Sequence, residues 1–188
     1  MYAVIDLETT GLKNSSEIAQ LAIWILDEEL NPVEFSNDYF SISEEMPPEA
    51  MRVNHLDKNT LYRLSGGKSF NDRSAEIVEK LRDKILVAHN ANFEKRILGY
   101  HLNHILDDNT WICTMLRYTP DLALKDRAGN NGYKQFNLSE LVSFTLKERN
   151  MDVNQLCEMY KRVTGKEAQF HDALYDTYCT ALAFNTFG

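Results

Sequence analysis

Residues 2–11 read Tyr-Ala-Val-Ile-Asp-Leu-Glu-Thr-Thr-Gly, and this stretch decides the class of fold. Residues 2–7 predict a buried strand, whereas the residues after Glu8 are typical of a turn. Side chains two residues apart on a strand point to the same face, so Asp6 and Glu8 project together. Two unpaired carboxylates at the end of a buried strand are costly unless a cation meets them. The same pair would also fit a plain strand end that faces water, so the stretch alone leaves both interpretations open.

The order of elements after this strand indicates a mixed α/β sheet covered by helices, because three early strands are followed by strands that alternate with helices. No internal repeat or low-complexity tract interrupts the order, so we expect a single domain over residues 1–188. The segment 125–134, which contains Gly129 and Gly132, is expected to be the most mobile loop. The expected strands are 2–7, 18–26, 33–42, 85–88 and 110–113, and the expected helices are 48–53, 70–83, 92–106, 138–148, 152–164 and 172–186, with a further short helix after residue 113.

Composition limits the kinds of partner. The chain has 188 residues, of which 44% are hydrophobic and 26% charged, which is enough for one sizeable core and argues against disorder. The formal net charge is −8 and the pI is about 5.1, the opposite of a protein that holds nucleic acid on a basic surface. The charge does not exclude an enzyme that grips one phosphate through bound cations, because such ions can be the largest local charges in a site.

Apolar runs and cysteines indicate the expected cellular location. No apolar run approaches the roughly 20 residues that cross a membrane. The first residues lack the basic region and apolar stretch of a secretory signal. The three cysteines Cys113, Cys157 and Cys179 lie far apart and lack the spacing of a metal site. We therefore expect a cytoplasmic protein with reduced thiols and no membrane partner.

Two later segments also carry acids at places where strands end or helices begin. His89-Asn-Ala-Asn-Phe-Glu94 follows the strand 85–88, and Glu94 falls in the first turns of the next helix, where an acid can also simply complement the helix dipole. His171-Asp-Ala-Leu-Tyr-Asp176 opens the last helix, and a lone histidine such as His171 is usually an ordinary surface residue. Neither segment indicates a site when it is taken alone.

The three segments together resemble the DEDDh 3′-5′ exonuclease superfamily, which includes the epsilon proofreading subunit of DNA polymerase III. The shared pattern is Asp-x-Glu on a first strand, His-Asn-Ala-x-Phe-acid after a later strand, and His-x-x-x-x-Asp at the start of a last helix. Residues 47–56 resemble a further family segment, and residues 111–115 and 171–179 are similar to the exodeoxyribonuclease X branch. The resemblance implies a ribonuclease-H-like α/β fold with a mixed five-stranded sheet flanked by helices.

The resemblance also implies a two-metal phosphodiester hydrolase that releases nucleoside 5′-monophosphates from nucleic-acid 3′ ends. Two divalent cations, Mg²⁺ or Mn²⁺, would be held by Asp6, Glu8, Glu94 and Asp176, ligands of the oxygen type that such ions prefer. Asp6 would bridge both ions, Glu8 and Asp176 would bind the ion that carries the attacking water, and Glu94 would support the second. His171 would be the general base, because an imidazole ordinarily titrates close to neutral pH.

Substrate contacts follow from the same resemblance. The terminal nucleotide would lie beside the turn after the first strand, with Leu12 against its base and sequence-tolerant stacking explaining digestion of any sequence. Asn54 stands where the family usually has histidine, and Phe93 fits a core position equally well. The expected substrate-binding residues are Thr9, Thr10, Gly11, Leu12, Asn54, Asn90 and Phe93.

Glu94 is the one departure among the acids, because the family normally has aspartate there. The extra methylene moves the carboxylate by roughly a bond length, which matters where catalytic groups are placed closely. An adjusted metal site, a slower or Mn²⁺-preferring enzyme and a non-catalytic module that binds nucleic acid or a partner are all compatible with it. The expected partners are single-stranded or frayed 3′ ends of DNA. An exoribonuclease of the RNase T or oligoribonuclease type, which would act on RNA, and a docked polymerase or other protein partner stay open.

Overall fold

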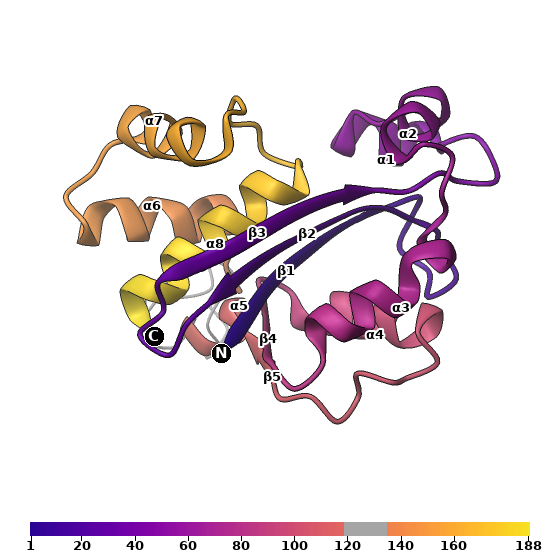
Figure 1. The fold of residues 1–188 in the computed structure, drawn as a ribbon. Coiled ribbons are helices and arrows are strands. Elements are labelled where there is room, and N and C mark those ends of the chain that lie inside the picture. Colours follow the sequence, from indigo (N-terminus) through magenta and orange to yellow (C-terminus); the bar gives the residue numbers. More distant parts are fainter. Residues whose placement is uncertain (119–134) are drawn as a thin grey trace, which may run out of the picture.

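A five-stranded mixed sheet forms the centre of the computed structural model, which describes residues 1–118 and 135–188 (Figure 1). The strand order is β3-β2-β1-β4-β5. β2 runs antiparallel to both β1 and β3, whereas β4 is parallel to β1 and β5 is parallel to β4. The expected ribonuclease-H-like topology class, a mixed five-stranded α/β sheet, is therefore confirmed. The strands are β1 (Tyr2–Thr9), β2 (Ile18–Leu26), β3 (Pro32–Tyr39), β4 (Ile85–Ala88) and β5 (Trp111–Cys113).

Helices cover both faces of the sheet (Figure 1). One apolar core joins the sheet to α3 and α4, and a second joins its other face to α5, α6, α7 and α8. α1 and α2 lie together beyond the end of the sheet where β1 finishes (Figure 1). The helices are α1 (Pro48–Asn54), α2 (Lys58–Ser65), α3 (Phe70–Leu81), α4 (Ala91–His101), α5 (Thr114–Tyr118), α6 (Leu138–Glu148), α7 (Val153–Thr164) and α8 (Ala173–Phe187).

The central strand β1 contributes side chains to both cores, because its residues alternate between the two faces. Ala3, Ile5 and Leu7 belong to the core under α3 and α4, whereas Val4 belongs to the core under α8. The alternation places the even-numbered Asp6 on the α8 face together with Val4. The same rule sends Glu8 to that face, so the acids of β1 point toward the last helix.

α8 is buried on nearly all sides, which explains its apolar composition. Every residue from Ala173 to Ala181 is buried, and the helix packs against β1, β2 and α6. A helix that is apolar all round is stable only inside a protein. The side chain of Asp172 begins it by accepting a hydrogen bond from the backbone N–H of Leu174 at 3.0 Å. The position of each α8 side chain is therefore fixed by packing.

The structure adds one helix to the expected elements and corrects two expected boundaries. α2 was not expected, although Asp57 caps its start and Gly66, with a φ of 62°, ends it. The helix expected over 92–106 ends at His101, because Asn103 and His104 adopt positive φ. The strand expected over 33–42 ends at Tyr39. The expected mobile loop at 125–134 lies outside the described residues, and no helix in the described ranges is long and apolar enough to cross a membrane.

The fold predicts that stability depends far more on the centre of β1 than on the edge strand β3. Ile5→Ala should lower the free energy of unfolding by about 2–5 kcal/mol, because the Ile5 side chain is fully buried and its loss leaves a cavity. Val33→Ala on β3 is the control, and should change it by less than about 0.5 kcal/mol because Val33 is 56% exposed. Urea unfolding followed by circular dichroism measures both, and equal losses would contradict the packing described here.

Candidate active site

The C-terminal end of β1 brings two carboxylates to the face that α8 covers. Glu8 lies opposite Gln20 on β2, and Asp6 lies opposite Ala22. Both side chains are half-buried, and no lysine or arginine of the described residues forms an ion pair with either of them. The expected acidic pair therefore does not face open water.

Glu94 reaches the same region from the first turn of α4. Its side chain is only 3% exposed, and Oε2 is buried without a hydrogen-bond partner. The N-cap residue Asn90 makes no side-chain cap, so α4 begins without the usual side-chain hydrogen bond. A buried carboxylate oxygen without a donor is costly in a folded protein. Helix capping alone does not account for Glu94.

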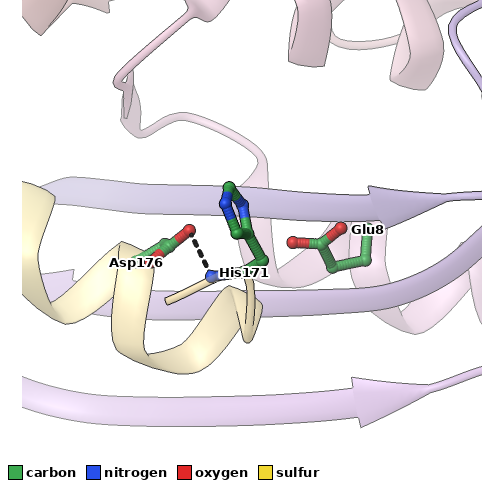
Figure 2. A group of neighbouring side chains, drawn as sticks. All are labelled: Glu8, His171 and Asp176. Carbon is green, nitrogen blue, oxygen red and sulfur yellow. Dashed lines mark hydrogen bonds between the residues drawn. The ribbon is translucent and has the colours of Figure 1, made fainter. Parts of the chain in front are cut away.

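Asp176 and His171 complete the group from the start of α8. Asp176 Oδ2 accepts a hydrogen bond from the backbone N–H of His171 at 3.1 Å, and Asp176 Oδ1 is buried without a partner. The imidazole of His171 is exposed and lies between the carboxylates of Asp176 and Glu8 (Figure 2). One ligand atom from each of these three residues lies within 4.8 Å of the others. The spacing is one that a metal ion could bridge.

Burial raises the pKa of all four acids, and the charges of neighbouring acids add to the rise for Asp6, Glu8 and Asp176. Burial is the largest cause for each, and it raises the pKa of Glu8 to about 8, that of Glu94 to about 8 and that of Asp176 to about 7. The pKa of Asp6 is raised well above its usual range by burial and then by the charge of Asp176. The charges of Asp176 and Glu94 also destabilise the ionised forms of Asp6 and Glu8.

This acid cluster, defined as Asp6, Glu8, Glu94 and Asp176, fits a divalent cation. Its oxygens are hard ligands, and two of them lack any hydrogen-bond donor. A bound cation would supply the missing partner and would stabilise the ionised carboxylates. Of the sequence predictions, the structure brings together all four acids and His171.

A cavity of about 580 Å³ opens beside the acid cluster, between β1, the turn after it and α1. Six of the seven expected substrate residues line it, and Asn90 does not. Leu12 is 79% exposed at the mouth, whereas Asn54 is buried and donates from Nδ2 to the backbone oxygen of Thr9 at 3.4 Å. The lining residues that were expected are Thr9, Thr10, Gly11, Leu12, Asn54 and Phe93.

The remaining wall of this cavity was not foreseen. Pro47, just before α1, and Ala50 and Val53 of α1 form its apolar part, and Glu49 and Lys13 add one charge of each sign. The sequence offers two indications, the family resemblance of residues 47–56 and the helix start at Pro48, but neither shows that the apolar side chains of α1 face β1. The apolar α1 wall and Leu12 together suit a flat, apolar group such as a base.

Comparison with known proteins gives one family over most of the chain. The model of the RNase_T family, described as exonuclease, matches residues 3–184. A 95-residue segment is 30% identical to the 3′-5′ exonuclease DinG of Staphylococcus aureus strain USA300, over 50% of this chain and 10% of that protein. The chain therefore spans only about a tenth of the length of the curated relatives it matches.

Solved structures share the fold. The structure titled exonuclease X in complex with 5′ overhanging duplex DNA superposes with a TM-score of 0.62 at 22% identity, covering 98% of this chain and 89% of that one. Escherichia coli exonuclease I in complex with a dT13 oligonucleotide gives a TM-score of 0.66 at 17% identity, covering 98% of this chain and 40% of that one. Exonuclease I from Methylocaldum szegediense gives 0.67 at 18% identity, with 98% and 39% covered.

The raised pKa values predict a stability that depends on pH and on metal. The folded acids keep their protons up to a higher pH than the unfolded acids, so the metal-free protein should lose stability as the pH rises from about 4 to about 8. Mn²⁺ or Mg²⁺ added at pH 8 should restore the melting temperature, because cations bind the folded cluster. Thermal melts in EDTA and in metal test both statements.

Glu94→Gln is the matched variant for these melts. It removes one titrating group with almost no change of shape, so the metal-free melting temperature should fall less steeply between pH 4 and 8 than in the parent protein. An identical pH dependence in the variant would mean that the pKa of Glu94 is not raised in the folded protein.

Proposed function

The chain belongs to the RNase_T family of 3′-5′ exonucleases, and on this premise we propose that residues 1–188 form one exonuclease domain that removes nucleoside 5′-monophosphates from the 3′ ends of DNA. One observation carries the proposal: four carboxylates converge beside a cavity that can hold a terminal nucleotide. Nothing cationic from the described chain neutralises them. A purely structural role would have no need for clustered, unpaired acids.

Two divalent cations, Mg²⁺ or Mn²⁺, would be held by Asp6, Glu8, Glu94 and Asp176. When bound, such a pair of ions stabilises the charge on the attacking and leaving oxygens of an in-line displacement. The acid cluster is suited to hold them because its oxygens are partly or fully buried, and a buried ionised carboxylate is stable only beside a cation or a hydrogen-bond donor. The raised pKa values of Glu8 and Asp176 in the absence of metal show that their ionised forms are poorly stabilised there.

His171 would accept the proton of the attacking water. Its ring is exposed and adjoins Glu8 and Asp176, so water beside the acid cluster can reach it (Figure 2). Its backbone is tied to Asp176 through the 3.1 Å hydrogen bond, which sets the start of the side chain. His171 would thus be a proton acceptor at the exposed edge of the acid cluster.

The cavity beside the acid cluster would receive the terminal nucleotide. Leu12, Val53 and Phe93 offer apolar surface to the base, and none of them can read a base edge by hydrogen bonds. Contacts of this kind tolerate every sequence. We propose DNA and not RNA as the substrate because two proteins of similar structure, exonuclease X and exonuclease I, form complexes with a 5′ overhanging DNA duplex and a dT13 oligonucleotide. An exoribonuclease activity is the alternative that the assay below separates.

A 5′-labelled single-stranded DNA incubated with Mg²⁺ or Mn²⁺ should shorten stepwise from its 3′ end, and an RNA of the same sequence should shorten more slowly. Asp6→Ala should abolish the ladder, and His171→Ala should reduce the rate about a hundredfold or more, as loss of a general base does. Glu79→Gln, an exposed acid on α3, is the control and should leave the rate unchanged. Full turnover by His171→Ala would remove His171 from the mechanism.

EDTA should stop the reaction. Faster digestion of RNA would favour the exoribonuclease function, and no metal-dependent product from either strand would favour a binding module that lacks catalysis.

Glu94→Asp tests whether the site is adjusted to the longer acid. We expect the rate to fall, by about tenfold or more, because the shorter side chain withdraws the buried carboxylate from its place and displacements near 1 Å are costly in active sites. Rates at several Mn²⁺ and Mg²⁺ concentrations measure the effect, with Glu94→Gln as the control that removes the charge. A large rise in rate would instead mean that Glu94 impairs the site.

A further inference from the structure

Gln20 is a polar residue in the most apolar strand of the sheet. β2 has nine residues, all buried, and Gln20 is the one with a side-chain amide. Only 1% of its surface is exposed, and it pairs with Glu8 on β1 and with Tyr39 on β3. A buried amide must find hydrogen-bond partners, so its contacts indicate what it does.

The amide of Gln20 links the sheet to the start of α8. Oε1 accepts a hydrogen bond from the backbone N–H of Ala173 at 3.3 Å. Nε2 donates to Asn37 Oδ1 at 2.8 Å and also approaches Asp172 Oδ1 at 3.4 Å. The backbone N–H of Ala173 can only donate, so it fixes which end of the amide faces the helix.

The turn held in this way contains His171 and precedes Asp176 of α8. His171 has a φ of 62°, a conformation that residues other than glycine rarely adopt and that persists only where the surroundings hold it. The turn is closed on one side by the hydrogen bond from the Asp172 N–H to the Gln169 oxygen at 3.3 Å. On its sheet side it meets Gln20. The amide therefore supports the segment that carries the His171 ring.

We propose that Gln20 is a positioning residue that fixes the start of α8 against β2 and so sets His171 and Asp176 relative to Glu8. The expected effect on kcat rests on the proposed exonuclease function. The positioning of α8 by Gln20 does not depend on that function. Gln20 lies opposite Glu8 in the sheet and does not line the nucleotide cavity. Its replacement should therefore slow the chemical step and leave substrate binding nearly unchanged.

Gln20→Met tests the proposal, since methionine has a similar volume and offers none of the three hydrogen bonds. We expect kcat to fall about tenfold or more, as for other residues that hold ligands in place, with KM changed less than about twofold. Thr145→Val is the matched control, because it removes an equally buried polar group from α6 without touching the site. If kcat falls in both variants in proportion to the loss of melting temperature, Gln20 has only a structural role.

If Gln20→Met fails to fold, Gln20→Asn serves instead, since it retains the amide but withdraws it from Ala173. Its kcat should fall in the same way, and an unchanged kcat would contradict the proposal.

A readout that needs no activity separates this inference from the proposed function. The rise in melting temperature on adding Mn²⁺ should be clearly smaller in Gln20→Met than in the parent protein, because Asp176 would be less well placed to bind the ion. An equal rise in both proteins would overturn the positioning role. If the parent protein binds Mn²⁺ but digests neither DNA nor RNA, the proposed function fails and this comparison still decides the role of Gln20.

Discussion

The confinement of four carboxylates to one poorly hydrated site is the constraint on which the rest of the structure depends. Burial is the largest cause that raises the pKa of each acid, and repulsion from neighbouring acids adds to it for Asp6 and Glu8. Carboxylate side chains that were free to move would turn toward water. The two apolar cores prevent this, because they fix the positions of β1, α4 and α8, which carry the acids. The result is a site that stores unfavourable electrostatic energy which bound cations can relieve.

Three elements meet at this point for a topological reason. β1 and β4 are parallel neighbours, so their C-terminal ends lie at the same edge of the sheet, where α/β proteins commonly bind ligands. β1 carries Asp6 and Glu8 near its C-terminal end, and β4 leads directly into α4, which has Glu94 in its first turn. α8 crosses the same face with Asp176 near its start. No single element forms the site, and the two apolar cores hold the elements in register.

The sequence predicted the acids well because their signals are local. The spacing of Asp6 and Glu8 places both on one face of a strand whatever the tertiary structure is. Glu94 was ambiguous, since an acid in a first helical turn also complements the helix dipole, and only its unpartnered buried oxygen in the structure favours the site. α2 had a cap at Asp57 and a stop at Gly66, so it was missed although the local evidence existed. The α1 wall and Gln20 depend on contacts distant in sequence, which no local pattern reveals.

The acidic net charge becomes intelligible once the proposed cations are considered. Two divalent ions would balance the four carboxylates of the cluster, so the site would no longer repel a phosphate. The remainder of the surface, with a formal charge of −8 for the whole chain, would still oppose a long duplex laid across it. Attraction would therefore be confined to the cluster and to cations at its rim such as Lys13. A protein with this distribution of charge is suited to hold a nucleic acid by its end, which is where an exonuclease acts.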